Sequence, residues 1–334
     1  MAIARIGLWL IVLSVFSVSL NAKPVVLAAA PFATYVDDEG EPARLNALVT
    51  EAFRRMGQDV QLDVMRQAFL GSALLSQKAD GEFASIDLGD VSDTVYYSQT
   101  YLPVYLYVAS KRQDVTDMRL VPHLSDARIA IENRFANTPR FRLIKDVKWS
   151  RNPSTFDTFR QVADDRAPYL LSSRLLIDEF NRLLAADNEE LLMLSGAPLV
   201  IAGIRLSVRK TLPDAGALLD SFDKTIAAMQ QDGTYNKLLA LNWLTKDITG
   251  DGVADYITST ALPHTSLDSA VLGFAYPLDA TKPSVDAVFV VDGDILPDWE
   301  AVRQRLTAAG EPSASSPRPS LLDASVYRTM IKRW

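Results

Sequence analysis

Residues 217–243 read ALLDSFDKTIAAMQQDGTYNKLLALNW, and this stretch is the most informative one for the fold. Its apolar side chains recur at helical spacing, at Leu219, Phe222, Ile226 and Met229. This spacing predicts an amphipathic helix with one apolar face on the core. Gly233 follows, where a helix often ends in a left-handed residue. We interpret the stripe as core packing and not as a binding site.

Strand-like and helix-like segments alternate upstream of this helix. Residues 24–30 (PVVLAAA) form a short apolar run, suited to a strand that is buried on both faces. Residues 45–56 repeat at helical spacing and stop at Gly57, and residues 60–65 (VQLDVM) alternate with period two. The order strand, helix, strand predicts an α/β fold with a largely parallel sheet. Further strands are predicted at 102–110, 127–131 and 200–209, and a further helix at 175–184.

Composition narrows the function classes. The chain has 334 residues, a length typical of two or three domains. Its net charge is −7 and its pI is near 5.0, so it offers no basic surface for nucleic acid. It has no cysteine, which excludes disulfides, thiolate zinc sites and lipid attachment to an N-terminal cysteine. With only two histidines, His123 and His264, centres built from several histidines are excluded too.

The first 22 residues read MAIARIGLWLIVLSVFSVSLNA. One positive charge, Arg5, precedes an apolar run of about 15 residues, and the small residue Ala22 precedes Lys23. This pattern predicts a cleaved secretory signal, and a membrane anchor is the alternative. The mature protein is therefore expected in the periplasm, free of the membrane.

Four segments in order resemble one known family. They are 31–57 (PFATYVDDEGEPARLNALVTEAFRRMG), 73–86 (ALLSQKADGEFASI), 96–112 (YYSQTYLPVYLYVASKR) and 217–243. Together they resemble the family 3 periplasmic solute-binding proteins, the amino-acid-type receptors of ABC uptake systems. The resemblance covers about residues 24–246.

The resemblance implies a two-lobed α/β fold, the type II periplasmic binding protein fold, with a hinge and a ligand cleft between the lobes. It places lobe 1 at residues 23–109 and 206–246, lobe 2 at 110–205, and a small C-terminal α+β extension at 247–334. The implied function is capture of a small polar solute, with closure stabilised by contacts that exist only in the closed form. The closed complex of a monomer would then dock on an ABC permease. A membrane sensor as the partner, without uptake, is the alternative.

The chain departs from the family at the charged groups of the amino-acid site. The family holds the ligand carboxylate with an Arg in a T-x-x-R turn, but residues 86–98 (IDLGDVSDTVYYS) offer Asp87, Asp90 and Asp93 instead. The Asp that binds the ligand ammonium group is replaced by Ser172 and Ser173 in APYLLSSRLL. Carboxylates on a short loop favour a cation, and solvated surface turns are the alternative.

Aromatic side chains resemble the cleft walls of the family and could hold an amine by cation–π contact. Arg134 is the candidate in lobe 2 for an anionic group of the ligand. The predicted ligand-binding residues are Phe32, Tyr35, Phe69, Asp87, Asp90, Ser92, Tyr97, Arg134, Ser172 and Ser173, with Tyr101 as a further aromatic wall.

Residues 247–255 (DITGDGVAD) resemble the short calcium loops of extracellular proteins. Five residues supply oxygens, namely Asp247, Thr249, Asp251, the carbonyl of Val253, and Asp255, while Gly252 permits the sharp turn. Thr258 stands where an EF-hand has a bidentate Glu. The loop thus predicts Ca²⁺ as a cofactor of modest affinity, and a metal-free acidic turn is the alternative. The last residues, RTMIKRW, predict a frayed terminus, with a partner-docking tail as the alternative.

Enzyme motifs such as G-x-S-x-G, H-E-x-x-H and the P-loop are absent from the sequence. Some proteins of the resembled fold are cyclohexadienyl dehydratases, in which a carboxylic acid in the cleft protonates a leaving hydroxyl. Glu132 or Asp90 could take that part, but the missing Arg counts against an anionic substrate. The prediction is a binding protein and not an enzyme.

Overall fold

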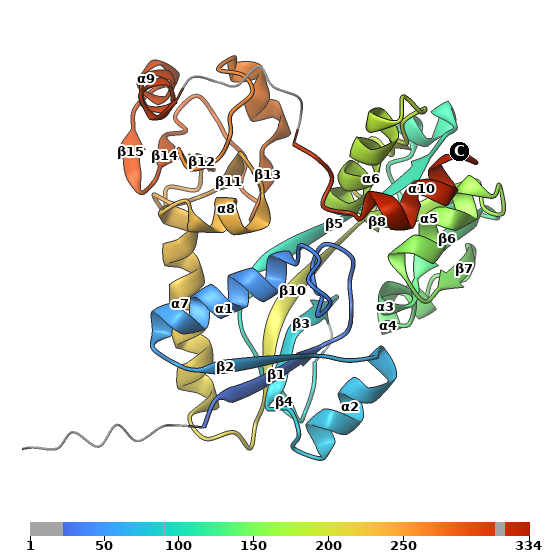
Figure 1. The fold of residues 1–334 in the computed structure, drawn as a ribbon, viewed down its shortest axis with the longest axis horizontal. Coiled ribbons are helices and arrows are strands. Elements are labelled where there is room, and N and C mark those ends of the chain that lie inside the picture. Colours follow the sequence, from blue (N-terminus) through green and yellow to red (C-terminus); the bar gives the residue numbers. More distant parts are fainter. Residues whose placement is uncertain (1–22, 90, 311–317) are drawn as a thin grey trace, which may run out of the picture.

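The structure, a computed structural model, describes residues 23–89, 91–310 and 318–334. The predicted signal segment and Asp90 lie outside the described residues. Figure 1 shows three parts, namely two lobes that share one sheet and an extension above lobe 1. Among the described residues, no helix is both long and apolar enough to cross a membrane.

The larger sheet has ten strands and runs through both lobes. Its main path is β2-β1-β3-β10-β5-β8-β6-β7, with β4 paired to β10 and β9 paired to β5. The strands are β1 (Val25–Ala29), β2 (Val60–Val64), β3 (Gly81–Asp87), β4 (Val95–Tyr97), β5 (Leu102–Ser110), β6 (Arg128–Glu132), β7 (Lys148–Asn152), β8 (Tyr169–Ser173), β9 (Met193–Leu194) and β10 (Val200–Arg209). The strand predictions at 102–110 and 200–209 are thus confirmed to the residue.

Strand directions explain how one sheet serves two lobes. The pairs β1–β2, β1–β3, β6–β7 and β6–β8 are parallel, as predicted. The central pairs β3–β10, β10–β5 and β5–β8 are antiparallel. The chain leaves lobe 1 along β5 and returns along β10 in the opposite direction, so the sheet is less parallel than predicted.

Helices cover the sheet where apolar stripes were predicted. They are α1 (Arg44–Met56), α2 (Gln67–Leu75), α3 (Asn133–Ala136), α4 (Pro139–Arg142), α5 (Thr155–Ala163), α6 (Arg174–Ala186), α7 (Ala215–Gln231) and α8 (Thr234–Leu239), with 3-10 turns at Gln113–Asp117, Val121–Leu124 and Ser269–Phe274. The predicted stripe of α7 is buried, and Gly57 ends α1 in the left-handed conformation with φ 68°. Gly233 is also left-handed, and α8 begins immediately after it.

The extension contains a sheet of its own. Its five strands, in the order β13-β11-β12-β14-β15, are β11 (Leu244–Lys246), β12 (Asp255–Thr258), β13 (Tyr276–Pro277), β14 (Phe289–Val291) and β15 (Asp294–Leu296). Helix α9 (Trp299–Ala309) packs on β14 and β15. A small separate core joins Trp243 and Phe289 to Val302 and Leu306 of α9.

The extension is fastened to lobe 1 by buried polar contacts. The Asn236 side chain on α8 is fully buried and donates to the Ile257 carbonyl at 3.1 Å. The Tyr276 hydroxyl donates to the carbonyl of Pro103 on β5 at 2.6 Å, and Tyr105 donates back to Pro277 at 3.1 Å. The extension thus attaches where β5 begins to cross between the lobes.

The C-terminal residues leave the extension and pack on lobe 2. Helix α10 (Ala324–Ile331) contacts α5 and α6, and Figure 1 shows it, in red, on that lobe. Tyr327, Met330 and Ile331 are buried in the main core. The prediction of a frayed terminus is therefore wrong, because the apolar residues of this basic segment share one helix face and bury it.

We expect Gly81→Ala to destabilise the protein, because a Cβ at this position would lie 1.9 Å from the Ser207 carbonyl oxygen on β10. Overpacking of this kind costs about 1–3 kcal/mol of unfolding free energy. The matched control is Gly71→Ala in the middle of α2, where a Cβ meets no atom within 4 Å. There the change should stabilise by about 0.5–1 kcal/mol. Urea denaturation measures both, and equal effects would contradict this account.

Candidate functional site

Six of the predicted binding residues lie at the carboxyl ends of strands from both lobes. Phe32 and Tyr35 follow β1, and Asp87 ends β3 in lobe 1. In lobe 2, Arg134 follows β6, and Ser172 and Ser173 end β8. Ligands of open α/β sheets bind in the crevice outside the carboxyl ends of the strands. These positions therefore define the candidate site.

Tyr35 joins the two lobes at this site. Its hydroxyl lies 2.9 Å from Ser173 Oγ, at the start of α6. The Tyr35 ring stacks on Phe32, with centroids 4.3 Å apart and planes 13° from parallel. Burial raises the pKa of Tyr35 to about 12, so its hydroxyl keeps its proton. Both aromatic side chains are buried at the junction between the lobes.

Arg134 reaches across from lobe 2. Its guanidinium carbon lies 3.8 Å from the centroid of the Phe32 ring, and Nη2 donates to the Pro31 carbonyl. Its Nε donates to Glu132 at 3.0 Å, and Glu132 also accepts from Thr155 Oγ1 at 2.8 Å. Because this guanidinium is already stacked and paired, an anionic ligand would have to compete with Glu132 for it.

The Asp87 carboxylate is paired with a cationic side chain of the protein itself. Its carboxylate lies 3.3 Å from Nη1 of Arg205 on β10, and it also accepts from the Gly89 amide and Thr100 Oγ1. The Arg205 guanidinium carbon lies 3.4 Å from the centroid of the Tyr97 ring. A cation–π contact was predicted near this loop, but Arg205 supplies the cation.

Arg205 was not among the predicted residues. The family motif places its arginine in the loop after β3, whereas Arg205 lies on the neighbouring strand β10. It lies opposite Ser85 in the β3–β10 register. The only sequence signal was a charged residue inside the apolar run of residues 200–209.

Three other predicted residues lie apart from these contacts. Phe69 on α2 exposes 57% of its surface. Ser92 Oγ pairs with Thr94 Oγ1 at 3.0 Å within its own loop. Tyr101 is a core residue of lobe 1, and its hydroxyl donates to the Phe83 carbonyl.

Ser172 and Ser173 are both buried, but only one is satisfied. Ser173 Oγ accepts from the Leu176 amide as the N-cap of α6 and also pairs with Tyr35. Within the described part of the chain, Ser172 Oγ has no hydrogen-bond partner. A buried hydroxyl without a partner costs free energy. The Ser172 hydroxyl therefore keeps hydrogen-bonding capacity that the described residues do not use.

A buried ion pair lies beside Tyr35 at the junction, with the Arg44 guanidinium carbon 6.0 Å from the Tyr35 ring centroid. Arg44, at the start of α1 in lobe 1, lies 2.5 Å from Glu179 on α6, and both side chains are almost fully buried. Arg44 also donates to Thr34 Oγ1 and to the Leu239 carbonyl. Burial opposes ionisation of Glu179, but hydrogen bonds from Arg318 and the charge of Arg44 hold its pKa below the usual value.

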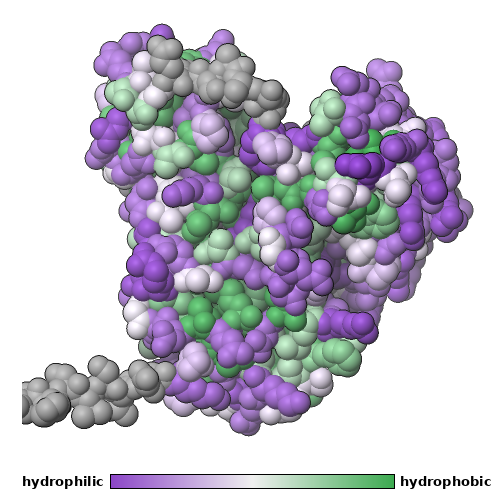
Figure 2. Space-filling view, viewed as in Figure 1, coloured by the Kyte–Doolittle hydropathy of each residue, from purple (hydrophilic) through white to green (hydrophobic). Residues whose placement is uncertain are grey.

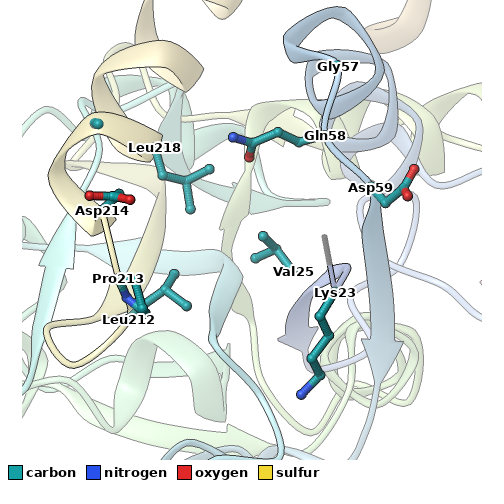
Figure 3. Close-up of a pocket in the computed structure, with 10 residues that line it drawn as sticks. Lys23, Val25, Gly57, Gln58, Asp59, Leu212, Pro213, Asp214 and Leu218 are labelled. Carbon is teal, nitrogen blue, oxygen red and sulfur yellow. The ribbon is translucent and has the colours of Figure 1, made fainter. Parts of the chain in front are cut away.

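Two cavities lie away from the junction. The larger, of about 410 Å³, lies between the start of β1 and the start of α7. Figure 3 shows Val25 and Leu218 at its centre, with Lys23, Asp59 and Asp214 around them. The smaller, of about 230 Å³, lies beside the end of β5 and the loop before β8. Neither cavity is lined by a predicted ligand-binding residue.

In the predicted calcium loop, the carboxylates accept hydrogen bonds from backbone amides. Asp247 accepts from the amides of Gly250 and Gly252, and Asp255 accepts from those of Ile248, Thr249 and Val288. Asp251 accepts from the Val253 amide. Over the described ranges, no three acidic, His or Cys side chains converge as a metal site would require. The carboxylates therefore stabilise the turn by these hydrogen bonds, and a metal ion would have to share their oxygens with the backbone amides.

Comparison with known proteins places the fold. No protein-family model and no curated protein matches the chain. The ligand-binding core of GluR0 in complex with L-glutamate matches with a TM-score of 0.56 at 8% identity, over 66% of this chain and 97% of that one. A histidine kinase sensor domain with similarity to periplasmic binding proteins matches at 0.53 and 16%, over 66% and 96%. The substrate-binding protein AbpA of an amino acid ABC transporter of Streptococcus pneumoniae, bound to L-arginine, matches at 0.52 and 16%, over 65% and 93%.

The chain therefore has the two-lobed fold of the type 2 periplasmic binding proteins, as the sequence resemblance implied. Each match covers almost the whole of the known structure. About one third of this chain, however, lies outside each match.

The two adjacent serines provide a test of the site. Ser173→Ala removes the cap of α6 and the Tyr35 contact, and we expect it to cost about 1–2 kcal/mol of unfolding free energy. Ser172→Ala removes a hydroxyl that has no partner, so stability should stay unchanged or rise by up to about 1 kcal/mol. Denaturant titration compares the pair, and a larger loss for Ser172→Ala would contradict this assignment.

Proposed function

We propose that the protein captures a small polar solute between its lobes, in the periplasm. The supporting observation is that polar and aromatic groups of both lobes converge at the carboxyl ends of β1, β3, β6 and β8. Tyr35 of lobe 1 contacts Ser173 of lobe 2 at this place. A solute that bridges the same groups would stabilise the closed form.

The charges at the site favour a solute without net charge. Each arginine is matched by a carboxylate, Arg134 by Glu132 and Arg205 by Asp87. A singly charged solute would have to displace one member of a pair and leave the other uncompensated. A neutral or zwitterionic solute can bind the Ser172 hydroxyl and lie against both pairs without that cost. This proposal replaces the expectation of a cation.

The partner is proposed to be an ABC permease. AbpA, among the matched structures, is a transporter component, whereas another match is a histidine kinase sensor domain. A membrane sensor is therefore the second candidate. An enzyme is not proposed, because Glu132, the candidate acid, accepts from both Arg134 and Thr155.

A thermal-shift screen tests solute capture. Amino acids, polyamines, quaternary amines, organic acids and neutral polar solutes are added to the mature protein. A ligand of the native state adds RT ln(1 + [L]/Kd), about 2.7 kcal/mol at 100 times Kd. We expect a rise in Tm with one class of uncharged or zwitterionic solute, and a smaller rise for Ser172→Ala at the same concentration.

The matched control in this screen is Ser92→Ala, because the described partner of this hydroxyl is Thr94 in the same loop. It should respond to the solute as the wild type does. A rise with polyamines alone would overturn the charge argument, and no rise with any class would count against solute capture.

We propose that Ca²⁺ binds the 247–255 loop weakly, through carboxylates that it shares with the turn. Millimolar Ca²⁺ should then raise Tm, and Asp251→Ala should abolish the rise, because among the described residues its carboxylate accepts a hydrogen bond only from the Val253 amide. Mg²⁺ at the same concentration is the control, since it demands a tighter octahedral shell. If the wild type gives the same Tm with Ca²⁺ and with a chelator, the loop is a metal-free turn.

A further inference from the structure

Helix α6 carries a row of charged side chains outside the candidate site. Arg174, Asp178 and Arg182 follow one another at intervals of four residues, so they share one side of the helix. All three are partly exposed. Figure 2 shows the surface hollowed between the extension and lobe 2, and Figure 1 shows α6 on the side of lobe 2 toward the extension.

The first two residues of this row neutralise each other. Arg174 Nε lies 2.8 Å from both carboxylate oxygens of Asp178. The Arg174 guanidinium carbon also lies 5.7 Å from the centroid of the Tyr107 ring on β5. Asp178 therefore has an arginine partner already, and its attraction for Arg182 is shared with that partner.

The carboxylate of Glu179, which lies one turn before Arg182, is occupied as well. Arg44 Nη2 lies 2.5 Å from Glu179 Oε1. Arg318 donates from both Nη atoms, one to each carboxylate oxygen, and the Leu321 amide donates to Oε2 at 2.8 Å. These four hydrogen bonds fill the roughly four acceptor positions of a carboxylate.

Arg182 is therefore left without a matching carboxylate. Among the residues that the structure describes, its Nε is buried and has no hydrogen-bond partner. Burial lowers the pKa of the Arg182 guanidinium, and the like charges of Arg318 and Arg44 lower it further. Three guanidinium groups thus surround the single carboxylate of Glu179, which leaves an excess of two positive charges. Charge that is partly withdrawn from water needs an opposite partner.

We propose that Arg182 and Arg318 form a binding site for a divalent oxyanion, such as a phosphate group. Arg44 is almost fully buried, whereas Arg318 exposes 23% of its side chain and Arg182 is half-buried, so a solute can reach the latter two. The planar guanidinium group presents pairs of N–H donors that match the oxygens of phosphate. The excess of two positive charges matches a dianion, and a carboxylate carries half of that charge.

This oxyanion site is separate from the candidate site for solute capture. Ser173, which contacts Tyr35, lies at the start of α6, and Arg182 lies nine residues further along. That separation is about 14 Å at the rise of an α-helix. Arg134 and Arg205, the arginines of the candidate site, are each paired with a carboxylate. The oxyanion site therefore does not rest on the proposed function.

Calorimetric titration of the mature protein with inorganic phosphate tests this site, at an ionic strength held constant with chloride. We expect saturable binding by the wild type. Arg182→Gln should weaken it about tenfold or more, because charge-assisted hydrogen bonds are lost. The matched control is Arg305→Gln, which removes the same charge from a pair with Asp294 in the extension and should keep the wild-type affinity. Acetate should bind more weakly than phosphate.

Melting curves separate ligand binding from a structural role. Without phosphate, Arg182→Gln should keep the wild-type Tm or raise it, because the change removes a like charge beside Arg44 and Arg318. With saturating phosphate, the wild type should gain Tm and Arg182→Gln should not. A lower Tm of Arg182→Gln without phosphate would mean that the arginine supports the fold, and it would overturn the argument of excess charge.

Glycerol 3-phosphate distinguishes the sources of the phosphate group. Tighter binding than inorganic phosphate would identify a larger phosphorylated solute, and weaker binding a free oxyanion, and both keep the site. Wild-type affinity in Arg182→Gln would overturn it, as would no binding by the wild type. Loss of binding in Arg134→Gln alone would place the anion in the candidate site and would overturn it too. A protein that binds phosphate through Arg182 but gives no response in the solute screen would keep this site and lose the proposed function.

Discussion

The carboxylate of Glu179 is the constraint on which the arrangement of the three parts depends. A carboxylate that is almost fully buried needs opposite charge and hydrogen bonds, because leaving it unpaired costs several kcal/mol. This chain supplies them from two distant segments, through Arg44 on one side and Arg318 and the Leu321 amide on the other. Satisfying this group therefore requires lobe 1, lobe 2 and the C-terminal segment to meet at one point.

The charges of the candidate site are likewise paired with opposite charges inside the protein. Arg134 and Arg205 each have a carboxylate partner and an aromatic ring beside them, Phe32 and Tyr97 respectively. The charges of these two arginines are thereby balanced inside the protein before any solute arrives. Among the described residues of the site, the Ser172 hydroxyl is buried without a hydrogen-bond partner. A solute would add to contacts that the protein makes itself, in contrast to a site in which ligand charges hold the lobes together.

Local patterns predicted most of the fold, because periodicity reports which residues are buried. The stripes of α1 and α7 and the runs of β5 and β10 were found at or near their observed bounds. The site was harder to predict, since its contacts join residues that are distant in sequence. Arg205 pairs with Asp87 across two neighbouring strands that are far apart in the sequence. The packing of RTMIKRW on lobe 2 was missed for the same reason, because nothing near Trp334 in the sequence indicates Phe180.

The contacts of Glu179 also bear on how the chain folds. They close loops of 135 residues to Arg44 and 139 residues to Arg318. Contacts at such separations require much chain entropy to be lost before they form, and topologies rich in them fold slowly. Until the C-terminal segment arrives, the Glu179 carboxylate lacks the hydrogen bonds from Arg318 and the Leu321 amide, and α6 lacks the aromatic cover of Tyr327 and Trp334. Lobe 2 thus reaches its native stability only after the C-terminal segment, residues 318–334, has docked on it.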